Sequence, residues 1–389
     1  MLFLINILKE SVQSELDDFF GRIKRSDTKK HTVTQSAFSQ ARAKLKHTAF
    51  IEMDSLQTGL FYSENDYKTW NGFRLAAIDG STLLLPANEE TEKAFGIHAV
   101  LKNGQKKVLA RISEAFDPLN HITIDASICP FVISEQAMML GHLEKLGAGD
   151  LAIYDRNYPG FWVYKVHQAK GINFCMRIQT KGRGKFIEDF VASGKKEDTV
   201  DVYCRTREAA QKCRELGLDT EPVRCRLIRV ELKNGVTEVL ITSLLDTGSF
   251  GHGCFMALYH LRWPVEEDYK FLKCRLELAN FSGKSVGAVH QDFYAKIFMA
   301  NLTSILAFDS NTAIDRKTKH RKLPYKVNWT NAASNMKKTG ALLFLRYNYK
   351  KLLDDLYIQF MVDPVSIRTD RTYARHKSWK SRQFSMCYK

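Results

Sequence analysis

Three acidic residues that lie far apart in the sequence have the chemistry to hold divalent metal ions together. Asp79 and Asp155 each stand at the end of a predicted strand, and Glu266 stands in the first turn of a predicted helix. Carboxylates are the hard oxygen ligands that Mg²⁺ prefers, and two ions about 4 Å apart can activate an attacking oxygen and stabilise a leaving one. The three acids therefore predict a two-metal site for phosphoryl transfer.

Glu266 is one of four residues at helical spacing in the stretch "YHLRWPVEEDYKFLK", namely Tyr259, Arg262, Glu266 and Lys273. Intervals of three, four and seven residues place all four on one face of a helix. Pro264 lacks a backbone donor and disfavours helix at the preceding residue, so we expect a kink or a restart with Pro264 at the first helical position. Glu266 then falls where the helix dipole favours an anion, and Arg262 and Lys273 are predicted to meet a phosphate.

Two further acids follow Glu266 directly, and helical geometry separates them from it. Glu267 lies about 100° and Asp268 about 200° around the helix, so neither shares the face of the four residues. Glu266 is therefore the predicted metal ligand. In an alternative interpretation, Glu266 is a solvated carboxylate paired with Arg262 or Lys270, four residues away on either side.

The elements that position the two aspartates are predicted strands. "FRLAAIDGSTLLLP" predicts a strand, a Gly-Ser turn and a second strand, and "ARISEAFDPLNHITIDASI" predicts two more strands joined at residues 117–120. A helix is predicted from about Ser134 to Lys145, with Ser134 as its cap, and residues 151–178 are typical of strand, loop, helix and strand. This order predicts an α/β fold with a mixed sheet flanked by helices. The aspartates are expected beside a crevice at the carboxyl ends of strands.

Residues 181–245 interrupt this pattern. They contain polar turns, a predicted short helix near Glu208 to Glu215, and a predicted hairpin with its turn at Asn234-Gly235. We interpret this block as a largely β insertion, after which the helical pattern resumes.

The charge of the chain favours a polyanionic partner. Lys and Arg number 58 against 43 Asp and Glu, a net charge of +15, which points first to nucleic acid and second to an anionic membrane. No apolar run is long enough to predict a transmembrane helix, and no secretory signal is recognised. The eight cysteines show no metal-binding spacing, so they are expected to be reduced thiols of a cytoplasmic protein.

Basic residues concentrate near both ends of the chain. Residues 311–389 hold 18 Lys and Arg against five Asp, and residues 22–47 hold eight against one. In the second stretch, the spacing of Phe38, Ala41 and Leu45 predicts a short amphipathic helix with three cations available for phosphate: Arg42, Lys44 and Lys46. A helical DNA-binding subdomain and a plain helical cap fit this stretch equally well.

Taken together, these motifs resemble the DDE transposases of bacterial insertion sequences, specifically the insertion-sequence-four family. The hallmark of that family is Tyr, two residues, Arg, three residues, Glu, six residues, Lys, which the four residues listed above match. The first family acid precedes Gly and Ser or Thr, as Asp79 does in "IDGST", and the second lies in a motif like "DRGY", matched by "DRNY" at Asp155. Asn157 stands where the family usually has Gly. The resemblance covers about residues 30–340.

The resemblance implies a ribonuclease-H-like catalytic core with a β insertion between the second and third acids. It implies a DNA transposase, in which metal-dependent attack of water at the element's end is followed by attack of the freed 3′-hydroxyl on target DNA. It implies two Mg²⁺ ions, replaceable by Mn²⁺, on Asp79, Asp155 and Glu266. It also implies four contacts to phosphates near the cleaved end, from Tyr259, Arg262, Lys273 and Arg177.

The partners that the resemblance implies are the terminal inverted repeats of an element, target DNA and a second copy in a synaptic complex, at the bacterial nucleoid. The corresponding domains are a helical DNA-binding region (1–72), a catalytic domain in two parts (73–180 and 246–310), the insertion (181–245) and a basic C-terminal region (311–389). Two alternatives stay open: a catalytically defective or domesticated DNA-binding regulator, and a ribonuclease-H-like nuclease.

Overall fold

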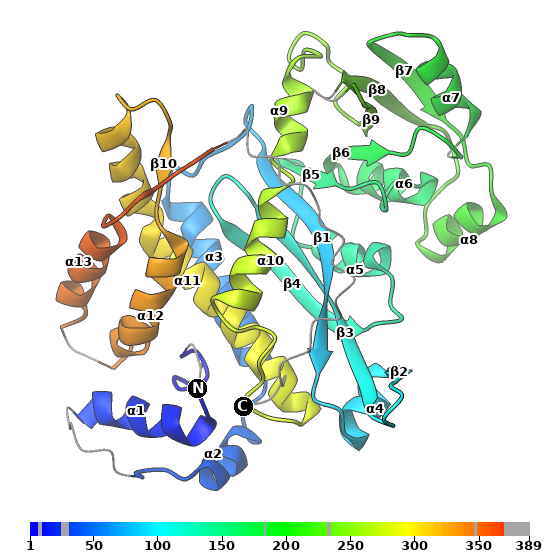
Figure 1. Cartoon of the computed structure of the whole chain (residues 1–389). Coiled ribbons are helices and arrows are strands. Elements are labelled where there is room, and N and C mark those ends of the chain that lie inside the picture. Colours follow the sequence, from blue (N-terminus) through cyan, green and yellow to red (C-terminus); the bar gives the residue numbers. More distant parts are fainter. Residues whose placement is uncertain (7–9, 25–30, 183, 232–234, 346–347, 369–389) are drawn as a thin grey trace.

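A large mixed sheet with helices on both faces organises the molecule (Figure 1). The structure is a computed structural model, and it describes residues 1–6, 10–24, 31–182, 184–231, 235–345 and 348–368. Within these ranges the sheet has nine strands in the order β2-β3-β1-β5-β6-β9-β8-β7, with β4 also paired to β3. The strands are β1 (Arg74–Leu85), β2 (Ile97–Val100), β3 (Lys106–Asp117), β4 (Ile122–Pro130), β5 (Asp150–Tyr154), β6 (Asn173–Ile178), β7 (Glu197–Val202), β8 (Val223–Glu231) and β9 (Thr237–Thr242).

The central strand β1 is longer than the sequence suggested. We predicted a turn at Gly80-Ser81, which is wrong, because these two residues continue the antiparallel ladder opposite Ser113 and Ile112 of β3. The predicted hairpin of β3 and β4 is present, and β5 and β6 run parallel to β1. The core therefore contains three antiparallel strands (β4, β3 and β1) and two parallel ones (β5 and β6), with a short helix, α4 (Glu89–Phe95), and β2 between β1 and β3.

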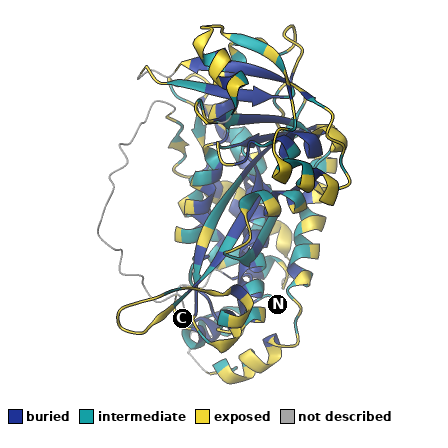
Figure 2. Cartoon of the chain, turned by 90° about the vertical axis from the view of Figure 1, so that its right-hand side faces the viewer, coloured by how far each residue is buried: buried dark blue, intermediate teal, exposed yellow. Residues whose placement is uncertain are grey.

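Two helices make the connections to the parallel strands, one between β4 and β5 and the other between β5 and β6. They are α5 (Glu135–Leu143) and α6 (Phe161–Lys170). The predicted cap of α5 is confirmed, because the Ser134 side chain accepts a hydrogen bond from the backbone N–H of Ala137. Gly171 ends α6 in the left-handed conformation, at a φ of 66° that glycine adopts without strain. Buried residues concentrate in the strands of the sheet, whereas the helices at its outer ends show exposed faces (Figure 2).

The region of residues 181–245, which we predicted to be a β insertion, continues the main sheet. It contains α7 (Lys185–Ala192), β7, α8 (Arg207–Glu215), β8 and β9. The helix predicted near Glu208 is present, and β8 and β9 pair as the predicted hairpin, although Asn234 of its turn lies outside the described residues. Because β9 pairs antiparallel with β6, the three insertion strands extend the sheet that carries the aspartates.

Helices α9 (Cys254–His260), α10 (Pro264–Cys274) and α11 (Val286–Thr318) follow the insertion. Pro264 stands at the start of α10, as predicted, so the chain restarts its helix there. In Figure 1, α10 runs along β1, and α11 packs beside α3 (Thr48–Glu64) and against β4. A large cluster of buried apolar residues lies between these helices and the sheet, and it includes Val265, Leu272 and Phe293.

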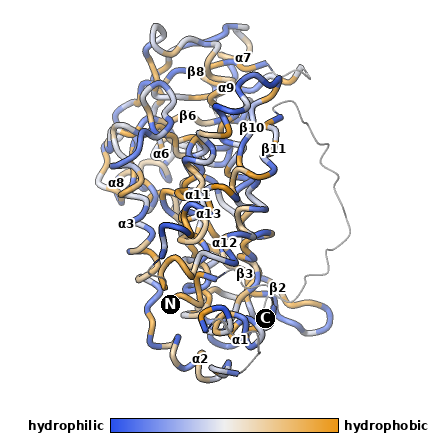
Figure 3. The backbone as a smooth tube through the Cα atoms, turned by 90° about the vertical axis from the view of Figure 1, so that its left-hand side faces the viewer, coloured by the Kyte–Doolittle hydropathy of each residue, from blue (hydrophilic) through white to orange (hydrophobic). Residues whose placement is uncertain are grey.

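A terminal region on the left of Figure 1 combines helices from the first and the last described parts of the chain, and residues 369–389 lie outside the described residues. Its elements are α1 (Val12–Lys24), α2 (Gln35–Arg42), β10 (Tyr325–Lys326), α12 (Trp329–Leu343), α13 (Tyr349–Phe360) and β11 (Val365–Ser366). Hydrophilic and hydrophobic residues are interspersed along these helices (Figure 3), and no helix in the described ranges is long and apolar enough to cross a membrane.

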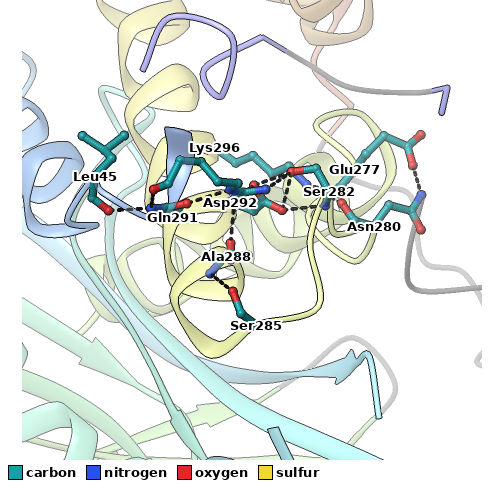
Figure 4. A network of polar contacts seen from close by, with 10 residues as sticks. Leu45, Glu277, Asn280, Ser282, Ser285, Ala288, Gln291, Asp292 and Lys296 are labelled. Atoms are coloured by element: carbon teal, nitrogen blue, oxygen red, sulfur yellow. Dashed lines mark hydrogen bonds and ion pairs between the residues drawn. The ribbon is translucent and has the colours of Figure 1, made fainter. Parts of the chain in front are cut away.

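The position of the Arg42 side chain differs from our prediction for the N-terminal region. We expected its side chain to be available for phosphate, but it is 7% exposed, and its Nη2 lies 2.9 Å from Asp292 Oδ1. Its other donors bond Gln291 Oε1, Ser282 Oγ and the carbonyl oxygen of Ala288. Figure 4 shows the acceptors of this network around the start of α11. Arg42 therefore anchors α2 to the core, while Lys44 and Lys46 are exposed.

Candidate active site

The sheet register brings the two predicted aspartates together. The parallel pairing of β1 with β5 ends at Ile78 opposite Tyr154, and Asp79 and Asp155 are the next residues of the two strands. Asp155 follows the end of β5, as predicted. Asp79 lies inside β1 and not at its end, because β1 continues along β3 after it leaves β5. The divergence of β1 from β5 thus produces the edge at which both carboxylates lie.

Burial changes the acidity of Asp79. Its side chain is 17% exposed, and the loss of hydration raises its pKa from 3.8 to about 6. Arg262 and the Gly80 N–H, which donates to Asp79 Oδ1 at 2.9 Å, oppose this shift. The negative charges of Asp155 and Glu135 add to it. Asp79 is therefore a carboxylate whose ionised form needs a nearby cation.

Arg262 supplies positive charge to two of the acids at once. Its Nη1 lies 3.5 Å from Asp79 Oδ2, and its Nη2 lies 2.6 Å from Glu266 Oε1. The ion pair of Arg262 with Glu266 that we considered as an alternative is thus present, but it includes Asp79. The Arg262 side chain is 7% exposed, and its Nε–H has no hydrogen-bond partner in the described part of the chain. One guanidinium therefore bridges the strand acid and the helix acid.

Helix α10 is held against β1 at Asp79 and at the residues that follow it, Ser81 and Thr82. The Tyr269 hydroxyl donates to the Asp79 carbonyl oxygen at 2.8 Å. Lys273 Nζ donates to Ser81 Oγ at 2.6 Å and to the Thr82 carbonyl oxygen at 2.9 Å, and burial lowers its pKa. These bonds set the position of Glu266 relative to the strand.

The other predicted DNA contacts lie nearby on separate elements. Tyr259 belongs to α9 and is 9% exposed, so the predicted single helical face is divided between two helices. Arg177, on β6, pairs with Glu238 at 2.9 Å. Both Arg262 and Arg177 act electrostatically on Tyr259, whose pKa burial raises. Tyr259, Arg177 and Arg262 are thus grouped near the end of α9, whereas Lys273 lies in the last turn of α10.

The three consecutive acids have three different environments. Glu266 is 29% exposed and bonded to Arg262. Glu267 is 70% exposed and paired with Lys270. Asp268 is 2% exposed, and burial raises its pKa beside the buried Glu114 of β3. Only Glu266 shares a partner with Asp79.

Sequence reasoning missed three residues at this edge. Glu135, the first residue of α5, packs so closely on Gly80 that a Cβ there would lie 2.6 Å from its Cγ. Arg111 Nη1 pairs with Glu135 Oε1 at 2.8 Å. Tyr158 is fully buried, and its hydroxyl has no hydrogen-bond partner among the described residues. Tyr158 was visible in the quoted "DRNY", whereas nothing in the sequence pointed to Glu135 or Arg111.

The donor set suits a hard divalent cation, although the acids do not surround one position. Within the described ranges, no three His, Cys, Asp or Glu side chains are close enough together to hold a metal ion. Asp79 and Glu266 instead share a guanidinium, which marks the point where their charges need compensation. Asp79, Asp155 and Glu266 therefore stay the predicted metal ligands, and Arg262 would have to leave its position between Asp79 and Glu266 for them to hold a metal.

Comparison with known proteins gives a relative and a solved structure. The chain is 25% identical over 272 residues to the transposase InsG for insertion sequence element IS4 of Escherichia coli (strain K12). The match covers 69% of this chain and 60% of that protein, so the chain spans less than two thirds of the relative's length. The cryo-EM structure of the piggyBac transposase synaptic complex with hairpin DNA aligns with 76% of this chain and 59% of its own, at 10% identity and a TM-score of 0.40.

A family model covers most of the elements described above. The family described as Transposase DDE domain matches residues 70–302, more than half of the chain, and this range includes Asp79, Asp155 and Glu266. The resemblance predicted from the motifs is confirmed by this match and by the identity to the IS4 transposase. The chain belongs to the family of transposase DDE domains.

Proposed function

We propose that this chain is a DNA transposase that cleaves strands at the ends of an insertion sequence and joins the freed 3′-hydroxyl to target DNA. The observation that carries the proposal is the register of β1 and β5, which sets Asp79 and Asp155 side by side while Arg262 links Asp79 to Glu266. Membership of the transposase family agrees with this chemistry.

Asp79, Asp155 and Glu266 would hold two Mg²⁺ ions, which Mn²⁺ could replace. The ions would supply Lewis acidity at a phosphate and lower the pKa of a water molecule. The residues of this chain prepare the site. Burial of Asp79 strengthens its need for a cation, and the bonds of Tyr269 and Lys273 to β1 hold the helix that carries Glu266.

The cations around the acids are suited to bind the DNA backbone. Arg262, released from Asp79 or Glu266, would present a bidentate donor to a phosphate. Arg177, Lys273 and Tyr259 would add contacts near the cleaved end. Since Arg177 and Lys273 are bonded to protein groups in the structure, DNA binding would have to exchange those bonds for phosphate contacts.

The architecture supports a ribonuclease-H-like core. Three antiparallel strands (β4, β3, β1) are followed by two parallel ones (β5, β6), and α5 and α6 connect them. We assign this core to residues 73–180 and 246–310, the insertion to 181–245, and DNA-binding regions to 1–72 and 311–389. The net charge of +15 fits inverted-repeat and target DNA as partners, with a second copy in the synaptic complex, in the bacterial cytoplasm at the nucleoid.

Cleavage of end DNA tests the proposal. Duplexes that carry the inverted repeats flanking the gene would be incubated with the protein and Mg²⁺, beside Asp155→Asn and a scrambled duplex. We expect a cut at the element end by the wild type alone. Binding without cutting would point to a regulator, and equal cutting of the scrambled duplex would point to a nuclease, and either result would reject the proposal.

A further inference from the structure

We propose that the hairpin of β2 and β3 is a DNA-binding arm, which contacts the backbone of the duplex away from the candidate active site. This inference rests on the proposed function, because it names a surface through which the DNA of that reaction is held. The hairpin consists of β2, the turn at residues 101–105 and the first residues of β3. It contains none of the residues for which we predicted a DNA contact.

The hairpin projects from the molecule as an ordered turn. In Figure 3, β2 is labelled at the base of a loop that extends beyond the neighbouring elements. Val100 pairs with Lys106, and the backbone N–H of Leu101 donates to the Gln105 carbonyl oxygen at 2.8 Å. Gly104, at a φ of 79°, supplies the left-handed conformation that the turn requires. All five residues of the turn are exposed, so a partner can reach them.

The charge of the hairpin is of one sign. Residues 96–113 contain four Lys and Arg and no Asp or Glu. One of the four, Arg111, is bonded to Glu135. The other three lie in or beside the turn: Lys102, Lys106 and Lys107. Lysines at the end of a projecting ribbon are complementary to the phosphates of a duplex, whose major groove admits a two-stranded ribbon.

Lys106 has an acidic neighbour on α4. Its Nζ lies 2.5 Å from Glu92 Oε2, and the Lys106 side chain is 47% exposed. An ion pair at this exposure contributes about 0–1 kcal/mol to stability. A DNA phosphate, whose neutralisation also releases counterions from the duplex, can therefore replace Glu92 as the partner of Lys106.

Apolar side chains are exposed beside the same lysines. Ile97 is 48% exposed, Val100 63% and Leu101 44%. Exposed apolar side chains gathered in one place mark an interaction site. In DNA complexes such side chains contact thymine methyl groups or insert between base steps. An apolar patch alone would suit a second protein, but the adjacent lysines favour a polyanion.

The length of β3 sets the distance between the hairpin and the acids. Glu114 of β3 lies opposite Asp79, and Lys106 precedes Glu114 by eight residues in the same strand. At about 3.4 Å per residue the separation is about 27 Å, which corresponds to about eight base pairs. The arm would therefore meet DNA within about one helical turn of a strand held at Asp79.

The salt dependence of DNA binding by the full-length protein tests the inference. Affinity for a duplex with the inverted repeat would be measured by fluorescence anisotropy at about 50–300 mM salt. The variant combines Lys102→Gln, Lys106→Gln and Lys107→Gln. We expect its binding to be about tenfold or more weaker, and the slope of log affinity against log salt to be smaller by about 2–3.

A matched triple variant removes the same charge elsewhere on the surface. It combines Lys170→Gln, Lys195→Gln and Lys212→Gln, three lysines that also pair with acids at the surface. Its slope should change by less than about 0.5. Equal losses in the two triple variants would mean that only net charge matters, which would reject the arm.

Two single variants separate charge from apolar contact. Lys102→Glu should lower the slope by about one or more, and it leaves the strands intact because Lys102 lies in the turn. Leu101→Ser should weaken binding about fivefold at an unchanged slope, since it removes apolar area without changing charge. Hydroxyl-radical footprints should lose protection within about one helical turn of the cut.

The outcomes distinguish this inference from the proposed function. If the wild type binds and cuts the end duplex while the hairpin variants keep its slope and an affinity within twofold, the hairpin is not a DNA-binding arm and the proposed function stands. If these variants change the number of copies in the complex, measured by analytical ultracentrifugation, at an unchanged slope, the hairpin contacts a second copy and the inference is rejected. If the wild type neither binds nor cuts the duplex, the proposed function fails and the arm fails with it.

Discussion

Arg42 and Arg262 are both buried arginines paired with an aspartate, one under α11 and the other at the edge of β1. Arg42 lies 2.9 Å from Asp292, and its remaining donors bond side-chain and backbone oxygens. Arg262 lies 3.5 Å from Asp79 and also forms an ion pair with Glu266. Its Nε–H has no hydrogen-bond partner among the described residues.

The difference between the two pairs indicates what each is for. A network in which every buried donor and acceptor is satisfied stabilises one packing arrangement. A pair with a long contact, an unsatisfied donor and an aspartate of raised pKa is ready to exchange partners. The Arg42 network is therefore structural, whereas the Arg262 group belongs to the site at which we propose that a metal ion and a phosphate bind.

The largest expected effect is on stability, at the satisfied pair. Arg42→Met should lower the free energy of unfolding by about 3–5 kcal/mol, because it leaves the Asp292 carboxylate buried without its cation. Urea-induced unfolding would measure the change, with Lys44→Met as the exposed control from the same region. A loss below about 1 kcal/mol would remove the distinction between the two pairs.

The next effect is on activity, at the unsatisfied group. Glu266→Gln should reduce cleavage of end DNA by about 100-fold, or about 2.7 kcal/mol in activation free energy, because a neutral amide is a poor ligand for a hard cation. Its unfolding free energy should change little, since Glu266 is 29% exposed. Cleavage at the wild-type rate would show that Arg262 and Glu266 form only a structural ion pair.

The contribution of Asp79 to the free energy of unfolding should fall as pH rises, whereas that of a carboxylate with a lowered pKa would grow. Its folded pKa of about 6 lies above the unfolded value of 3.8, so its stabilising contribution is complete below pH 3.8 and is lost as pH rises through 6. Asp79→Asn should therefore be about 1–3 kcal/mol more stable than the wild type at pH 7.5, with the gain developing between pH 4 and 6.

Chemical denaturation across this pH range would measure the gain, beside Asp292→Asn as the matched change in the satisfied network. The second variant should be destabilised at every pH, because Asp292 accepts bonds from Arg42 and Ser282. If the two variants lose stability equally at pH 7.5, burial does not penalise Asp79.

The smallest effect is expected at Glu267, next to Glu266 in the sequence. Glu267→Gln should change unfolding free energy by less than about 0.5 kcal/mol and cleavage by less than twofold, because the side chain is 70% exposed and its ion pair with Lys270 lies on the surface. A cleavage defect as large as that of Glu266→Gln would mean that the helical register of the site had been misassigned.

Features that depend on neighbouring residues in the sequence, such as helix starts and caps, were predicted correctly. Pro264 at the start of α10 and Ser134 as the cap of α5 follow from backbone chemistry and were predicted correctly. The turn predicted at Gly80 failed, since a glycine that admits a neighbouring carboxyl group looks like a turn glycine in the sequence. Arg42 was predicted to be exposed because its partners lie some 250 positions away, and no local pattern records them.

The same limit applies to the active site. The spacing around Glu266 could be read because it lies within one segment. The pairing of Arg111 with Glu135 could not, because it depends on how β3 and α5 pack on β1. Residues joined by tertiary packing alone were therefore missed.

The pairing of β9 with β6 has a consequence for how the molecule could be shortened or rearranged. The insertion strands cover a sheet edge, since β6 would otherwise present unpaired N–H and C=O groups beyond β5. Excision of residues 181–245 would convert an interior strand into an open template for pairing with other chains. We expect such a deletion to aggregate, so residues 181–245 and the strands that they cover would have to be transplanted or engineered together.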